Sequence, residues 1–209
     1  MLFTPHRVAC YCVLAMPAKE RLPSQEIMTD LASALAEQFV VRHDLQARQL
    51  EDGSYFCLKK PLLLQHLKAH LAGKITLGTY LLDEESRGKF LVLDADSDPD
   101  WRRLRALSVW LAEEGTITYL EHSRRGGHLW FFFEGPLPGE EIRAFGEGIL
   151  AFFGIETIEV YPKQSQLTSG PGSLIRLPFG VHRKAGRRYG FHLPSGDRLA
   201  ATLKQQILV

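Results

Sequence analysis

Cysteine is scarce in this sequence, with three among 209 residues, at Cys10, Cys12 and Cys57. Three cysteines at these spacings exclude a disulfide framework and a four-ligand zinc site. We therefore expect no zinc, and a reducing cytoplasm is the expected compartment.

A long apolar run is lacking as well. Residues 8–16 are apolar and follow Arg7, as in a short signal peptide, but they are too few to cross a bilayer. The sequence therefore predicts no contact with a membrane.

An excess of charge of either sign is also absent, because 25 Lys and Arg stand against 24 Asp and Glu and give a net charge of +1. An argument for a nucleic-acid partner must therefore rest on where the charges lie. Internal repeats, low-complexity tracts and long linkers are missing too. With 45% apolar residues, we expect one domain over residues 1–209, with an N-terminal αβ module of about residues 1–88 and a second module of about 89–200.

Four amphipathic helices are predicted from apolar residues that recur at helical spacing. They run from Ser24, as N-cap, through Ile27, Leu31, Leu35 and Phe39; from near Pro61 to Gly73; from Asp98, as N-cap, to Gly115, with Trp101, Leu104, Leu107 and Leu111 on one face; and from Pro138 to Gly154, with Ile142, Phe145, Ile149 and Phe152 facing inward. Proline near the start and glycine after the end are ordinary signals for helix boundaries.

Strands are predicted between the helices. Residues 77–82 and 89–94 have hairpin spacing, residues 116–121 and 128–134 form a second pair, and short strands lie near 156–161, 173–177 and 188–192. Pairing largely through hairpins indicates an α+β fold with mixed or antiparallel sheets, not a doubly wound parallel sheet. The second half, in the order strand, helix, strand, strand, helix, strand, matches the split βαβ pattern.

An apolar strand ends in alternating carboxylates at Asp94 and Asp96. Because side chains alternate along a strand, both point to one face and can share a pair of hard cations such as Mg²⁺ or Mn²⁺. Asp98, directly before Pro99, is better explained as a helix cap. An acidic strand end that faces water gives the same pattern, so a metal site depends on the neighbouring motifs.

A second motif, residues 122–128, is a turn of small residues with two arginines that leads into an apolar strand. The backbone amides of Gly126 and Gly127, flanked by arginines such as Arg125, form a candidate site for phosphate oxygens. His128 begins the strand, and its ring is expected to face that site. A plain hairpin turn with solvated arginines is the open alternative.

Glu159 is a carboxylate inside an apolar strand, on the face opposite Ile158 and Val160. It needs a partner or a metal there unless that face is solvated. Downstream, residues 163–188 hold six basic residues and His182 but no Asp or Glu. Such a segment suggests a surface for a triphosphate or a strand backbone, although a solvated cationic loop has the same composition.

Taken together, these motifs resemble those of the archaeo-eukaryotic primase superfamily, in particular its small primase-polymerase domains associated with CRISPR, mobile elements or conflict systems. The first acidic motif of that family matches Asp94 and Asp96, and its third-motif acid matches Glu159. Its Ser/Gly-rich turn ending in His matches residues 122–128, with His122 where the family usually has Ser. The likeness extends over about residues 31–189.

The resemblance implies an RRM-like catalytic module and DNA-dependent nucleotidyl transfer from NTP or dNTP to a 3′-hydroxyl. Two Mg²⁺ or Mn²⁺ ions would be held by Asp94, Asp96 and Glu159. The implied nucleotide-binding residues are Ser123, Arg125, Gly126, Gly127, His128, Lys163, Arg176 and His182. The implied nucleic-acid-binding residues are Arg48, Gln49, Tyr55, Arg183, Lys184, Arg187 and Arg188. The implied partners are a single-stranded DNA template, a primer strand, and further domains or CRISPR or DNA-replication proteins.

Two other functions remain open from the sequence. A catalytically impaired module of the same fold would bind nucleic acid or nucleotide without transfer, as the altered second motif suggests. A metal-dependent nuclease would use the same acidic cluster and need no nucleoside triphosphate.

Overall fold

The computed structural model describes residues 24–200 and Ile207. Its named helices are α1 (Gln25–Phe39), α2 (Leu64–Leu71), α3 (Asp98–Glu113) and α4 (Gly139–Phe152). Its strands are β1 (Gln46–Gln49), β2 (Tyr55–Leu58), β3 (Leu77–Tyr80), β4 (Arg87–Ala95), β5 (Tyr119–His122), β6 (Gly127–Pro138), β7 (Glu159–Tyr161), β8 (Leu174–Arg176), β9 (Val181–His182), β10 (Arg187–Arg188) and β11 (Phe191–His192). Cys10, Cys12 and the apolar residues 8–16 lie outside the described residues. Among the helices of the described part, none is long and apolar enough to cross a membrane.

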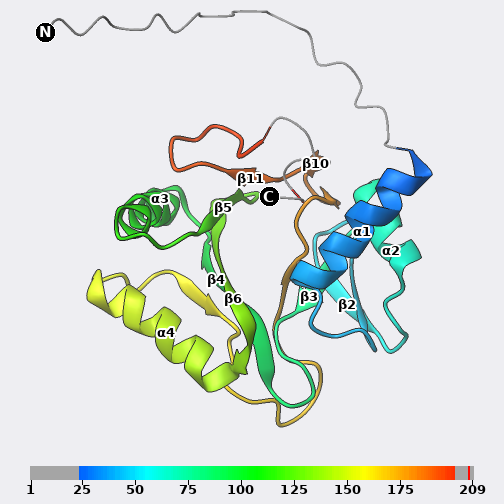
Figure 1. The fold of residues 1–209 in the computed structure, drawn as a ribbon, viewed down its shortest axis with the longest axis horizontal. Helices are drawn as coiled ribbons and strands as arrows, with labels where there is room; N and C mark the ends of the chain where they lie inside the picture. Colours follow the sequence, from blue (N-terminus) through cyan, green and yellow to red (C-terminus); the bar gives the residue numbers. More distant parts are fainter. Residues whose placement is uncertain (1–23, 201–206, 208–209) are drawn as a thin grey trace, which may run out of the picture.

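Two antiparallel sheets form the centre of the molecule. One has four strands in the order β2-β1-β3-β8, and the other has five in the order β11-β5-β6-β4-β7. The order β5-β6-β4-β7, with α3 and α4 as the two connections, is the split βαβ arrangement, so this prediction is confirmed. Figure 1 shows α3 and α4 on one side of the five-stranded sheet and the four-stranded sheet, with α1 and α2, on the other.

Alternation along β4 explains why both faces of the five-stranded sheet are buried. Leu91 and Leu93 belong to a core with α3 and α4, whereas Phe90 and Val92 belong to a second core with α1 and the four-stranded sheet. All four side chains are fully inaccessible to solvent. Residues of β4 with even numbers therefore face the space between the two sheets.

The predicted hairpin of residues 77–82 and 89–94 is wrong. The first strand, β3, pairs with β1 and β8, whereas β4 pairs with β6 and β7, so the two strands lie in different sheets. The polar connection closes a turn of its own, because the Asp83 carboxylate accepts hydrogen bonds from the amides of Glu85 (3.0 Å) and Arg87 (2.8 Å). Spacing in the sequence does not reveal that a chain changes sheets at such a turn.

The inward face of α4 also differs from the prediction. Ile142, Gly146 and Leu150 are buried, whereas Phe145 is 44% and Phe152 is 75% exposed. Gly146 allows the helix to approach the sheet closely, which turns this face of the helix inward. A pattern of large apolar residues alone does not identify a glycine as the point of contact.

Two predicted helix starts are shifted. Ser97, not Asp98, is the N-cap of α3, because its extended backbone lets its hydroxyl accept from the Asp100 amide (3.3 Å), and Asp98 is the first helical residue. Helix α2 begins at Leu64, not near Pro61, since the Pro61 carbonyl accepts a hydrogen bond from the Gln46 side chain (2.7 Å) instead of entering the helix.

The C-terminal part of the chain returns to the first sheet. Strand β8, which lies within the second predicted module, pairs with β3 of the first. The space between the sheets is therefore bounded by segments from both halves of the sequence.

Candidate active site

Four polar side chains from four adjacent strands form one row across the five-stranded sheet. Glu121 of β5 lies opposite His128 of β6, His128 lies opposite Asp94 of β4, and Asp94 lies opposite Glu159 of β7. Directly opposed residues project from the same face of a sheet, so these side chains are neighbours. We refer to Glu121, His128, Asp94 and Glu159 as the polar row.

The carboxylates near this row are each paired with a cationic or potentially cationic side chain. Asp94 Oδ1 lies 3.4 Å from His128 Nε2, and both of these side chains are largely buried. Asp96 forms an ion pair with Arg125 (2.6 Å) in which both side chains are more than half exposed. The third ion pair lies at β7, where Lys163 Nζ is 2.9 Å from Glu159 Oε2.

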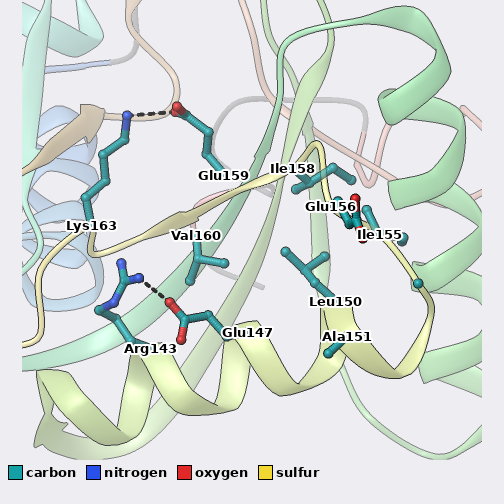
Figure 2. Close-up of a pocket in the computed structure, with 11 residues that line it drawn as sticks. Arg143, Glu147, Leu150, Ala151, Ile155, Glu156, Ile158, Glu159, Val160 and Lys163 are labelled. Carbon is teal, nitrogen blue, oxygen red and sulfur yellow. Dashed lines mark hydrogen bonds and ion pairs between the residues drawn. The ribbon is translucent and has the colours of Figure 1, made fainter.

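Figure 2 shows Glu159 leaving β7 on the side away from Ile158 and Val160, as alternation predicts. Ile158 and Val160 line a groove of about 670 Å³ between β7 and α4, and Glu159 and Lys163 lie at its border. The Tyr161 hydroxyl donates a hydrogen bond to Glu159 Oε2 (3.2 Å) on the side of the polar row. Glu159 therefore lies on the same face of the sheet as Asp94 and points away from α4, toward Lys163.

Electrostatics distinguish Asp94 from the other acids. Burial raises the pKa of Asp94 above its ordinary value; His128 opposes this effect, and Asp96 and Glu159 add to it. Carboxylates this close repel one another unless a cation lies among them. The donor set therefore fits a hard divalent cation, which prefers carboxylate oxygens.

The acidic side chains do not converge on one point as a ready-made metal centre. Among the residues that the structure describes, no group of three or more His, Cys, Asp or Glu side chains is arranged to hold an ion. The reason lies in the ion pairs, since Asp96 is turned toward Arg125 and Glu159 toward Lys163. Both pairs are about half exposed, so their exchange for a cation costs little free energy.

A cavity of about 400 Å³ lies between the acids and the opposite wall. The five-stranded sheet contributes Asp94, His128, Glu159 and Tyr161, and Asp96 follows β4. The opposite wall is formed by Gln49, Tyr55, Leu174, Ile175 and Arg176 of the four-stranded sheet and by His182 and Lys184 beside it. Asp52 and Gly53, from the turn between β1 and β2, also line this side, so the cavity has an acidic wall and a wall in which donors and cations outnumber the one acid.

Some predicted site residues line this cavity and others do not. The cavity brings together these predicted residues: Asp94, Asp96, Glu159, Ser123, Arg125, His128, Arg176, His182, Gln49, Tyr55 and Lys184. The predicted residues outside its lining are Gly126, Gly127, Lys163, Arg48, Arg183, Arg187 and Arg188. Of these, Arg48 donates to Gln46, Arg183 to the Lys74 carbonyl and Arg188 to the Phe179 carbonyl.

The two glycines of the turn have a packing role. A Cβ on Gly126 would collide with the Ala95 carbonyl, and one on Gly127 would collide with the Trp101 ring. The Gly126 amide donates to Ser123 Oγ (3.2 Å), and both glycines are buried. We therefore assign no phosphate to these amides and keep Ser123 and Arg125 as the residues of the turn that face the cavity.

Sequence reasoning missed Glu121. This side chain is fully buried, with His128 Nδ1 at 2.8 Å from Oε2 and Arg176 bound to Oε1. Burial raises the pKa of Glu121, but the nearby Arg176 and His128 more than offset this effect and leave the pKa below its ordinary value. Its one signal in the sequence was a carboxylate at the end of an apolar strand that pairs with the strand of His128.

Two polar atoms on the donor-rich wall have no partner. Within the described part of the chain, Tyr55 Oη and Arg176 Nη1 are buried and form no hydrogen bond. Burial raises the pKa of Tyr55, so its phenol is neutral and able to donate. The Arg176 guanidinium also stacks on Tyr189, 5.1 Å from the ring centroid.

A family model described as the archaeo-eukaryotic primase domain of the TOTE conflict system matches residues 31–197. The chain belongs to this family. The predicted primase resemblance and the α+β fold are thereby confirmed. The match concerns a conflict system, so it does not support the expected role in DNA replication, and a CRISPR association stays a prediction.

Other comparisons are more distant. The polymerase domain of Mycobacterium tuberculosis ligase D, solved in complex with DNA, shares 12% sequence identity with this chain at a TM-score of 0.46, over 87% of this chain and 86% of that one. No curated protein matches the sequence. Membership of the primase family supports a nucleotidyltransferase-type function in general terms.

Proposed function

We propose that this domain joins nucleotides from NTP or dNTP to the 3′-hydroxyl of a primer strand on a single-stranded DNA template. The observation that carries the proposal is the gathering of charge around one cavity, where Asp94, Asp96 and Glu159 lie opposite a wall that holds Arg176, His182 and Lys184 and a single acid, Asp52. Nucleotidyl transfer needs both, because it brings a polyanionic substrate to a reacting hydroxyl.

Asp94, Asp96 and Glu159 are the proposed ligands of divalent cations. Their oxygen donors and mutual repulsion suit Mg²⁺ or Mn²⁺. Such cations, when bound, lower the pKa of the attacking hydroxyl and stabilise the charge on the leaving pyrophosphate. Arg125 and Lys163 hold two of these carboxylates in the described structure and would be released from them.

The triphosphate is proposed to lie against the donors of the cavity. Arg125, once released from Asp96, remains beside the cavity, which is also lined by His128 and by Arg176, whose Nη1 has no hydrogen-bond partner. Charge-assisted hydrogen bonds from several directions fix a phosphate in place and stabilise its charge during transfer. His182 and Lys184 extend the same wall and are proposed to contact nucleotide or strand phosphates.

Primer extension by the purified chain with Mn²⁺ and either NTP or dNTP tests the proposal. We expect elongation by the wild type and a rate roughly 100- to 1000-fold lower with Asp94→Asn or Asp96→Asn, because a ligand charge is lost where phosphate charge must be balanced. Glu147→Gln is the matched control, since Glu147 pairs with Arg143 on α4, outside the cavity. An Asp94→Asn variant that keeps more than a tenth of the rate would refute the assignment.

The same assay separates the two other functions. A binding module would retard the template in a gel and add no nucleotide. A nuclease would shorten the strand without any nucleoside triphosphate. Either result would overturn the proposed transfer reaction.

A further inference from the structure

Glu121 is the most enclosed acid of the site, with no exposed surface on its side chain. Its Oε2 accepts hydrogen bonds from His128 Nδ1 (2.8 Å) and Trp130 Nε1 (3.1 Å). Its Oε1 accepts from Arg176 Nη2. Both oxygens of the carboxylate are thus held by donors of the protein, and the side chain has no exposed surface through which a substrate or a metal ion could reach it.

The two charged partners of Glu121 come from different sheets. His128 is on β6 of the five-stranded sheet, and Arg176 is on β8 of the four-stranded sheet. Glu121 thus connects two residues that line the cavity from different sheets. Both partners line the cavity and have a second nitrogen: His128 Nε2 lies 3.4 Å from Asp94 Oδ1, and Arg176 Nη1 has no hydrogen-bond partner.

Stability alone is a poor reason for this arrangement. The desolvation of a buried ion pair offsets most of its Coulomb energy, and apolar residues of similar volume are often as stable. What a buried carboxylate does provide is orientation. It holds a proton on the Nδ1 atom of an imidazole, which directs Nε2 outward, and it fixes the rotation of a guanidinium plane.

We infer that Glu121 is a positioning residue, which aims His128 Nε2 and Arg176 Nη1 from opposite walls at one phosphate group. The identification of that group with a nucleotide triphosphate rests on the proposed function. The neighbouring Tyr55 hydroxyl, buried and unpartnered on the same wall as Arg176, is a third donor for this group. Phosphate has three oxygens in different directions, so it can accept from Tyr55 and Arg176, and from His128 Nε2 when the imidazole has a proton on both nitrogens.

Glu121→Gln tests the inference with little change of volume. In glutamine one of the two oxygen positions becomes an NH2 group, which would face either the Arg176 donor or the His128 and Trp130 donors and cannot accept from them. We expect the Kd for Mg²⁺-tripolyphosphate, measured by calorimetry, to rise at least tenfold. Asp100→Asn is the matched control, because Asp100 is also a buried, ion-paired carboxylate but lies on α3 and binds Arg103. Its Kd should stay within twofold of the wild type.

A folded Glu121→Gln variant with an unchanged Kd would overturn the inference. A second measurement needs no variant: ¹⁵N spectra of the imidazoles in the wild type. We expect a proton on His128 Nδ1 and a shift of the Nε2 resonance when tripolyphosphate is added. A bare Nδ1, or an Nε2 that does not respond, would equally refute positioning by Glu121.

Neither measurement involves nucleotide transfer. A wild type that binds tripolyphosphate through His128 but never extends a primer would refute the proposed function and leave the role of Glu121 intact. If the wild type extends primers but Glu121→Gln binds tripolyphosphate as tightly as the wild type, the positioning role of Glu121 is refuted and the proposed function is retained.

Discussion

Gly146→Ala tests the close packing of α4 against the strands that carry the acids. A Cβ at this position would lie 2.8 Å from Val160 Cγ1 and 2.9 Å from Leu91 Cδ1. Leu91 is fully buried on β4, and Val160 follows Glu159 on β7. Leu91 has no open space to move into, so the added methyl group must displace the helix, β7 or the Val160 side chain, which borders the groove.

Two effects of opposite sign determine how much Gly146→Ala changes the free energy of unfolding. Alanine in a helix is about 1 kcal/mol more favourable than glycine, whereas overpacking a core costs about 1–3 kcal/mol. Gly146→Ala should therefore lower the free energy of unfolding by about 0–2 kcal/mol. Gly148 is the matched control, since it is exposed on the same helix and a Cβ there would meet nothing within 4 Å. Gly148→Ala should raise the free energy of unfolding by about 1 kcal/mol.

Urea unfolding followed by circular dichroism measures both variants. The difference between them isolates the packing cost, expected at about 1–3 kcal/mol. Because displaced β7 carries Glu159, we also expect slower primer extension in Gly146→Ala and an unchanged rate in Gly148→Ala. Equal stabilisation by the two substitutions would show that α4 does not contact the sheet as described.

Two further predictions concern single side chains. His70 is fully buried, accepts from the Leu77 amide (3.0 Å) and donates to the Pro178 carbonyl (2.9 Å), and burial lowers its pKa to about 4. The unfolded chain gains a proton near pH 6.5 that the folded chain does not, so stability present above pH 6.5 is lost as the pH falls toward 4, by up to about 3 kcal/mol. Urea midpoints between pH 7 and pH 4.5 measure this loss, and a wild-type slope that persists in His70→Gln would contradict it. Arg125→Ala should change the free energy of unfolding by less than about 1 kcal/mol, because the ion pair of Arg125 with Asp96 is exposed. In primer extension, the same variant should have a higher KM for nucleotide. An unchanged KM would show that Arg125 does not bind the nucleotide phosphates.

Local patterns in the sequence were sufficient to predict the half of the fold that contains the five-stranded sheet and its two helices. The order of strands and helices from β4 to β7 follows from periodicity within short segments, and the buried face of α3 was predicted correctly for the same reason. The facing of Asp94 and Asp96 needed only the two-residue repeat of a strand. That Glu159 lies next to Asp94 depends on strand pairing, which the sequence suggested only through the family resemblance.

The errors have a common physical origin in contacts between distant segments. Sheet membership of β3 depends on its pairing with β1 and β8, which no feature of residues 77–94 encodes. The inward face of α4 depends on Gly146, whose role appears only when β7 packs against it. Glu121 was missed because its partners, His128 and Arg176, are 7 and 55 residues away in the chain.

The register that forms the core also aims the acids. The row next to the polar row contains Tyr119, Trp130, Val92 and Tyr161, which pair across the same four strands and pack between the two sheets. If the pairing of β4 shifted by one residue, the side chains of both Val92 and Asp94 would turn to the opposite face of the sheet, toward α3 and α4. Such a slip would expose or misplace several large apolar side chains, at a cost far greater than any repulsion among the carboxylates. The hydrophobic row therefore holds Asp94 in a position that is unfavourable for an unpaired carboxylate and suited to a cation.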